Sequence, residues 1–183
     1  IGYKKKPNKE IVWIINNRVA KNIEKLSPSD FSDRVGNQGK TFIRALIKGA
    51  RNNANFIQQK LLVLDFDQEP EQISYAEFCD RCMEYNIPFA FTYKTFSYDG
   101  RSKYFKFRAV FIMDILITDS KFATAVNKLL YQLFPEGDKK CLDVARMFYG
   151  GKGIIDSNLD ARVDVRNIFF YAVDQIKKKA GSN

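Results

Sequence analysis

One stretch most strongly constrains the fold of this chain: Leu61-Leu62-Val63-Leu64-Asp65-Phe66-Asp67. A short aliphatic run of this kind is typical of a buried β-strand. Residues two apart on a strand point to the same face, so Asp65 and Asp67 should project together from the strand's end. Because two neighbouring carboxylates repel and are costly to bury, the pair indicates a nearby cation such as Mg²⁺. A turn aspartate followed by a helix-capping aspartate is the alternative interpretation.

The residues after this run predict an α+β fold. Their patterns follow the order β-α-β-β-α-β, which is typical of ferredoxin-like and RNA-recognition-type (RRM-like) domains. The expected strands cover 61–67, 88–93, 104–113 and 141–148, and the expected helices cover 73–85 and 119–134, with turns at 68–70 and 135–138 and a hairpin-like connection at 97–102. In this fold class the fourth strand usually lies beside the first, so we expect the spatial order 4-1-3-2 with one open face.

The rest of the chain is expected to extend a single compact domain. Residues 1–60 predict an N-terminal helical and strand extension, with a helix at 8–26 and a strand at 42–47. Residues 61–153 form the expected core. Residues 154–183 form a closing element, either strand or helix over 163–178, and a basic tail. Because residue 1 is Ile, we expect a fragment of a longer protein.

Charge and length favour a polyanionic partner. The 183 residues are enough for one sizeable core. Lys and Arg number 30 against 21 Asp and Glu, a net charge of +9, which points to nucleic acid first and an anionic membrane surface second. We find no apolar run of transmembrane length and no signal-peptide pattern. The sequence therefore predicts a cytoplasmic protein without a membrane partner.

The cysteine and histidine counts exclude several chemistries. Cys79 and Cys82 have a C-x-x-C spacing inside a helical pattern, and only Cys141 remains as a further thiol. A closed zinc site needs four such ligands, so we expect reduced thiols. With no histidine in the chain, Ser-His-Asp triads and histidine–metal sites are excluded. Any chemistry must use carboxylates, cations or thiols.

Period-two alternation brings charged residues from three expected strands to one face. Asp65 and Asp67 share this face with Lys106 and Arg108 of the third strand and with Asp143 of the fourth. Three carboxylates can hold two divalent ions, which stabilise the attacking and leaving oxygens of a phosphoryl displacement. The two cations would then face a triphosphate. A solvated, salt-bridged strand face is the alternative.

These residues resemble the three motifs of the archaeo-eukaryotic primase superfamily, which includes primase-polymerases of plasmids, phages and other mobile elements. The first motif is a hydrophobic strand ending Asp-x-Asp, as in Leu64-Asp65-Phe66-Asp67, and the third is a hydrophobic residue before Asp, as in Leu142-Asp143. The second carries small-x-His, and here Arg108 stands in place of the His. The stretches 39–45 and 145–151 are similar to the mobile-element branch, so the resemblance covers roughly residues 36–153.

The resemblance implies a DNA primase, a primer-extending polymerase, or both. Such an enzyme performs template-directed nucleotidyl transfer with Mg²⁺ or Mn²⁺, here held by Asp65, Asp67 and Asp143. Its substrates are NTPs or dNTPs, its template is single-stranded DNA, and its partner is a fused or separate helicase in the replication of a mobile element. The family His contacts nucleotide phosphates, so we expect Arg108 to do the same.

Further residues are expected to contact the nucleotide or the template. Lys106, Arg146 and Lys152 are expected at the nucleotide, and the glycines around Lys152 allow close backbone approach to a phosphate. The residues expected at the nucleic acid are Lys40, Arg44, Arg51 and Tyr104, the last by stacking on bases.

Two other functions stay open at this point. One is a catalytically weak or inactive single-stranded nucleic-acid or origin-binding module of the same fold. The other is a metal-dependent nuclease built from the same carboxylates.

Overall fold

A five-stranded antiparallel sheet forms the centre of the computed structural model, which describes residues 8–19, 21–67, 73–98 and 105–180. Its strand order is β2-β3-β5-β4-β7. The strands are β2 (Ala45–Ile47), β3 (Phe56–Phe66), β4 (Phe91–Lys94), β5 (Phe107–Ile117) and β7 (Ile154–Ser157). The α+β class is as predicted.

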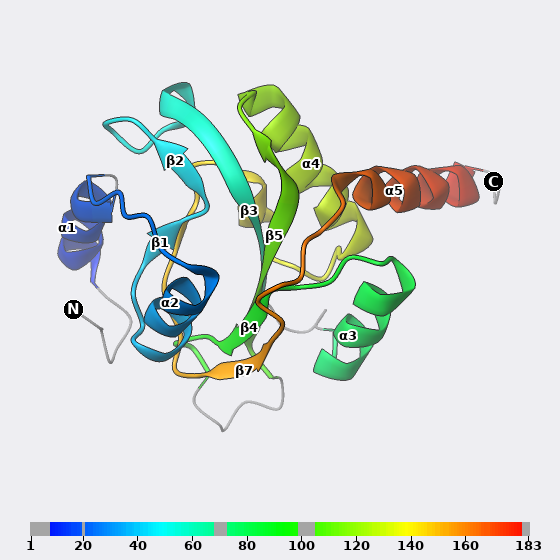
Figure 1. Ribbon diagram of the computed structural model, residues 1–183, viewed down its shortest axis with the longest axis horizontal. Coiled ribbons are helices and arrows are strands. Elements are labelled where there is room, and N and C mark those ends of the chain that lie inside the picture. Colours follow the sequence, from blue (N-terminus) through cyan, green and yellow to red (C-terminus); the bar gives the residue numbers. More distant parts are fainter. Residues whose placement is uncertain (1–7, 20, 68–72, 99–104, 181–183) are drawn as a thin grey trace.

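Three helices cover one face of the sheet (Figure 1). They are α3 (Tyr75–Glu84), α4 (Ser120–Leu133) and α5 (Val165–Ala180), so the open choice for 163–178 is resolved as a helix. Leu64 and Phe66 of β3 and Phe107 and Phe111 of β5 belong to the core cluster beneath these helices. The predicted period-two assignment of both long strands is therefore confirmed.

The opposite face, predicted to be open, is covered by a second core cluster. It is formed by α2 (Pro28–Ser32), the π-helical η1 (Asp33–Asn37) and a two-stranded ribbon of β1 (Phe42–Ile43) and β6 (Met147–Phe148). The Phe42 and Phe148 rings stack with centroids 5.5 Å apart, and Phe31 packs edge-on against Phe42. The N-terminal segment thus folds over the face that carries Asp65.

The predicted fourth strand at 141–148 is wrong. The chain forms a short 3-10 helix, η3 (Lys139–Leu142), then a loop, and only Met147–Phe148 is a strand, paired with β1. The order 4-1-3-2 is therefore also wrong. The neighbour of β3 on that side is β2, which pairs with its first residues, Phe56 to Gln59.

The N-terminal segment also differs from its predicted layout. The expected helix 8–26 is α1 (Lys9–Val19), and residues 21–27 are not helical. The expected strand 42–47 is two strands in different sheets, separated by Arg44, and a 3-10 turn, η2 (Asn53–Asn55), precedes β3. The predicted turn at 68–70 and most of the hairpin at 97–102 lie outside the described residues.

Within the described ranges, no helix has both the length and the hydrophobicity that crossing a membrane requires.

Candidate active site

A buried ion pair lies at the centre of the candidate site. Asp65 of β3 is the register partner of Arg108 of β5, which is in turn the partner of Tyr93 of β4. The Nη2 group of Arg108 donates to Asp65 Oδ2, and the two side chains are only 8% and 6% exposed. Asp65 Oδ1 is also buried and has no hydrogen-bond partner. The predicted convergence of Asp65 and Arg108 is therefore observed, but inside the protein.

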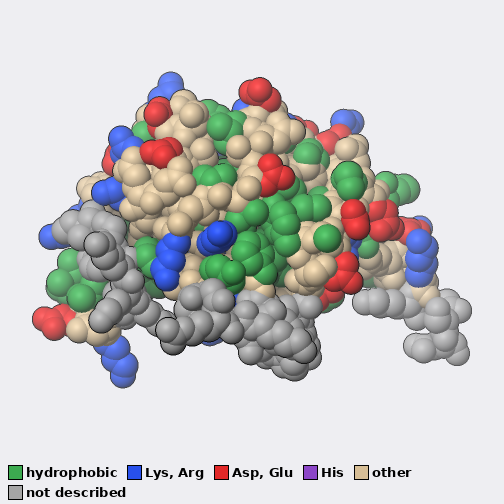
Figure 2. All heavy atoms as spheres, turned by 90° about the horizontal axis from the view of Figure 1, so that it is seen from below, with side chains coloured by type: hydrophobic (Ala, Val, Ile, Leu, Met, Phe, Trp, Pro, Cys, Tyr) green, Lys and Arg blue, Asp and Glu red, His purple; other side chains and the backbone are tan. Residues whose placement is uncertain are grey.

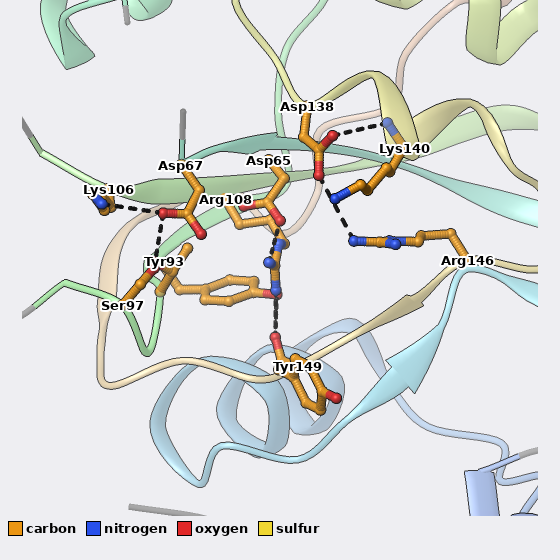
Figure 3. Close-up of polar contacts among 11 residues, drawn as sticks. Asp65, Asp67, Tyr93, Ser97, Lys106, Arg108, Asp138, Lys140, Arg146 and Tyr149 are labelled. Atoms are coloured by element: carbon orange, nitrogen blue, oxygen red, sulfur yellow. Dashed lines mark hydrogen bonds and ion pairs between the residues drawn. The ribbon is translucent and has the colours of Figure 1, made fainter. Parts of the chain in front are cut away.

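Two tyrosines fix the Arg108 guanidinium from its other side (Figure 3). Its Nη1 group donates to the Tyr93 hydroxyl at 3.1 Å and to the Tyr149 carbonyl. The Tyr93 hydroxyl also donates to that carbonyl, at 3.1 Å. The guanidinium carbon lies 5.3 Å from the Phe148 ring centroid and 5.6 Å from that of Tyr93, within cation–π range. These contacts hold Arg108 in one orientation.

Burial and neighbouring charges shift the pKa values in this network. Burial raises the pKa of Asp65, Arg108 opposes this shift, and Asp67 and Asp138 add to it. Burial alone would lower the pKa of Arg108, but the charges and hydrogen bonds of Asp65 and Tyr93 raise it above its ordinary value. Burial also raises the pKa of Tyr93, to about 12. Tyr93 therefore stays neutral and Arg108 stays charged at neutral pH.

Asp67 forms the more accessible part of the site. Its side chain is 38% exposed, lies on the same face as Asp65, and has Lys106 Nζ at 3.5 Å from Oδ1. The Ser97 hydroxyl donates to the same Oδ1 at 2.9 Å. As predicted, Lys106 and Asp67 meet at the end of the two long strands, whereas Ser97 follows β4 and was not predicted.

Asp138, which was not predicted, is the third carboxylate close to Asp65. Its backbone N–H donates to the Asp65 carbonyl at 2.7 Å, and its Oδ1 accepts from the Lys140 N–H at 2.9 Å. Arg146 Nη2 lies 3.7 Å from its Oδ2. Asp138 precedes η3 in a turn after α4, where no periodic pattern marks its orientation.

Asp143 lies elsewhere, in the exposed turn after η3. Its Oδ1 accepts from the Ala145 N–H at 3.0 Å, and its carbonyl accepts from Arg44. The predicted position of Asp143 on a strand beside Asp65 is wrong, because residues 143–146 form a loop with its own hydrogen bonds.

Comparisons with known proteins return a single distant likeness. No protein-family model matches the chain, and no curated protein sequence matches it. Among solved structures, the chain is similar to the AEP domain (PP-N190) of the Cyanophage S-2L primase-polymerase (PrimPol), with 11% identity and a TM-score of 0.47. The match covers 69% of this chain and 66% of that one. At this level the likeness assigns no role to any residue.

Arg44 and Arg51 hold the Asp143–Ala145 loop in place. Arg44 is buried, donates to the Asp143 carbonyl and lies 5.8 Å from the Phe148 ring centroid. Burial lowers its pKa to about 10. Arg51 donates to the Ala145 carbonyl at 2.7 Å and to Asn16 at 3.1 Å. Both arginines, predicted at the nucleic acid, therefore contact the protein's own backbone.

The remaining predicted residues lie around the edge of the site. Lys152 is exposed, and its Nζ lies 3.4 Å from the Tyr98 carbonyl. Lys40 lines a groove of about 920 Å³ between the N-terminal segment and the sheet, together with Arg18, Lys25 and Lys60. Tyr104 lies outside the described residues.

Surface charge is unevenly distributed on the face shown in Figure 2. Lys and Arg side chains gather on the left of this view, and most Asp and Glu side chains lie at its top and right. Such a separation gives one side of the molecule a positive field, which attracts polyanions.

The described residues fit a divalent cation only in part. No group of three or more His, Cys, Asp or Glu among them is arranged to hold a metal ion. The unpartnered Oδ1 of Asp65 and the partly exposed carboxylate of Asp67 are nevertheless oxygen donors of the kind that Mg²⁺ and Mn²⁺ take. Such ions often complete their coordination with water and substrate phosphates.

Proposed function

We propose that this chain is a metal-dependent nucleotidyltransferase domain that acts on nucleic acid, as a primase, a primer-extending polymerase, or both. One observation carries the proposal. Asp65 and Asp67 lie on one face at the end of β3, beside Lys106 of β5, and a buried oxygen of Asp65 lacks a partner. A buried, unpartnered carboxylate oxygen is costly unless a ligand satisfies it.

In this proposal Asp65 and Asp67 hold Mg²⁺ or Mn²⁺. The bound ion would stabilise charge on the attacking and leaving oxygens of a phosphoryl displacement. Asp138, with its backbone bonded to Asp65, is a candidate for the third carboxylate in place of Asp143. Lys106, Arg146 and Lys152 are the candidates for binding the triphosphate of an NTP or dNTP.

The net charge of +9 and the uneven surface charge support a nucleic-acid template. Lys40 and the other cations of the groove are the candidate contacts for single-stranded DNA. A fused or separate helicase remains a prediction of the family resemblance.

The test is nucleotide incorporation on single-stranded DNA, with and without a primer, in Mg²⁺ or Mn²⁺. Asp65→Asn and Asp67→Asn should each lower incorporation by about a hundredfold or more, because ligand loss removes several kcal/mol of transition-state stabilisation. Asp138→Asn and Asp143→Asn should differ, with the larger loss for Asp138→Asn. Asp164→Asn, which alters an exposed pair at the start of α5, is the control.

Metal-dependent product that survives both Asp65→Asn and Asp67→Asn would contradict the proposal. Shortened DNA without added nucleotide would instead indicate a nuclease.

A second candidate, a nucleic-acid-binding module without catalysis, is favoured by the charge balance of the site. Asp65, Asp67 and Asp138 each already have a cation within ion-pair distance: Arg108, Lys106 and Arg146. This candidate requires salt-sensitive binding of single-stranded DNA that neither EDTA nor Asp65→Asn alters. A fluorescence-anisotropy titration at two salt concentrations would measure it.

A further inference from the structure

The contacts of Arg108 differ from those of a phosphate-binding residue. Both of its terminal nitrogens donate to groups of the protein: Asp65, the Tyr93 hydroxyl and the Tyr149 carbonyl. The side chain is only 8% exposed and lies between two aromatic rings. To reach a triphosphate, the guanidinium would have to break these bonds and leave Asp65 unpaired.

The same contacts define the orientation of Asp65. Its Oδ2 accepts from Arg108, so the carboxylate plane is fixed by a group that is itself fixed on its far side. The other oxygen, Oδ1, is then left buried without a partner. Asp67 and Asp138 both lie close enough to affect the charge of Asp65. The one unsatisfied oxygen is thus held in place among carboxylates.

From this geometry we infer that Arg108 is a positioning residue, which holds Asp65 so that its Oδ1 can bind a divalent cation, and that Arg108 does not contact the nucleotide. The inference rests on the proposed function and revises the role that the sequence predicts for Arg108. Groups in the second layer of metal sites commonly orient ligands in this way. Phosphate binding is then left to cations with looser partners.

Lys106 and Arg146 have those looser partners. Lys106 Nζ lies 3.5 Å from Asp67, and Arg146 Nη2 lies 3.7 Å from Asp138. The Arg146 side chain is 34% exposed. Both can exchange a carboxylate for a phosphate at lower cost than the buried Arg108 can.

The deciding experiment compares metal binding with nucleotide binding in the same variants. Mn²⁺ binding is measured without nucleotide, by the electron paramagnetic resonance signal of the free ion. Nucleotide binding is measured without metal, by the fluorescence of a labelled ATP. Neither measurement needs catalytic turnover.

Arg108→Lys keeps the charge, but a single ammonium cannot reproduce the planar, forked set of bonds. We expect its Mn²⁺ affinity to fall by about tenfold or more, with metal-free nucleotide affinity unchanged within about twofold. Lys106→Ala should show the opposite: weaker nucleotide binding, with a smaller effect on Mn²⁺. Arg166→Lys, in an exposed pair with Asp164, should change neither affinity.

Tyr93→Phe provides a milder variant in case Arg108→Lys does not fold. It removes one acceptor of Arg108 and leaves no charge unpaired. We expect a several-fold loss of Mn²⁺ affinity, smaller than that of Arg108→Lys.

Three results would overturn the inference. The first is weaker nucleotide binding by Arg108→Lys with unchanged Mn²⁺ affinity. The second is a lower melting temperature of both Arg108→Lys and Tyr93→Phe with unchanged Mn²⁺ affinity, which would make the network purely structural. The third is no Mn²⁺ binding by the unsubstituted protein, which would reject the proposed function as well. The first two leave the proposed function standing.

Discussion

At the residue scale, two adjacent glycines let the loop after β6 pack directly against backbone. A Cβ on Gly150 would lie 2.3 Å from the carbonyl carbon of Gly39, and one on Gly151 would lie 2.6 Å from the Lys94 carbonyl oxygen. Real Cβ atoms do not approach other atoms this closely. The preceding residue, Tyr149, supplies the carbonyl that accepts from Arg108. Packing of this loop therefore affects the geometry of the site.

We expect Gly150→Ala to lower the free energy of unfolding by about 2 kcal/mol or more, because the new methyl group would force backbone apart. Urea denaturation followed by circular dichroism measures the change. Gly137→Ala is the matched control, since its nearest atom, the Phe134 carbonyl oxygen, would be 3.3 Å away. Equal stability of the two variants would contradict this packing.

Residue positions on strands could be predicted, whereas residue positions in turns could not. Period-two alternation placed Asp65, Lys106 and Arg108 on one face because a pleated strand permits no other arrangement. Asp138 has no such rule, since its orientation depends on a backbone bond to Asp65, 73 residues earlier in the chain by subtraction of the two numbers. That kind of tertiary contact leaves no local pattern.

At the element scale, a capping box begins α3. The Ser74 hydroxyl accepts from the Glu77 N–H at 3.2 Å, and the Glu77 carboxylate accepts from the Ser74 N–H at 3.0 Å. These hydrogen bonds from Ser74 lower the pKa of Glu77. A carboxyl group with a lowered pKa stabilises the fold above its unfolded-state pKa, and this stability is lost as the pH falls through the folded-state pKa.

Ser74→Ala should therefore cost about 1 kcal/mol of unfolding free energy near neutral pH. Ser74→Asn, which keeps a capping side chain, should cost less. In Glu77→Gln the part of the acid-induced loss of stability that Glu77 carries should disappear. Thermal denaturation of the variants over a series of acidic and neutral pH values measures both effects. An unchanged pH profile in Glu77→Gln would contradict the second expectation.

The predicted elements were correct where the pattern was long and wrong where it was short. The periodicity of β3, β5 and α4 extends over more than ten residues in each, and all three were predicted. Residues 141–144 alternate apolar and polar over only four positions. Such a short run also fits the end of a 3-10 helix followed by a loop, which is what forms.

At the scale of the whole molecule, the N-terminal segment is part of the folded core. It contributes the edge strand β2 and, through α2, η1 and β1, one side of the second core cluster. Helix α1 contributes less, because Ile15 is its only buried residue. The alternation of apolar residues on both faces of β3 indicates a sheet buried on both sides, but not which segment covers the second face.

We expect a chain that starts at residue 61 to lose cooperative unfolding, because the second cluster loses Val35 and Phe42 and β3 loses β2. A chain that starts at residue 27 should unfold cooperatively, with a lower melting temperature than the full chain. Near-ultraviolet circular dichroism and differential scanning calorimetry distinguish the two. Cooperative unfolding of the shorter chain would show that residues 61–183 suffice.

The ribbon of β1 and β6 joins Phe42 to Phe148, and β7 closes the sheet against β4. Pairings between segments so distant in sequence carry a large loop-closure entropy and slow folding. During synthesis, moreover, Asp65 and Arg108 are complete long before Tyr149 emerges to fix them. The ion pair must therefore stay hydrated until the last third of the chain arrives, which places the assembly of the site at the end of folding.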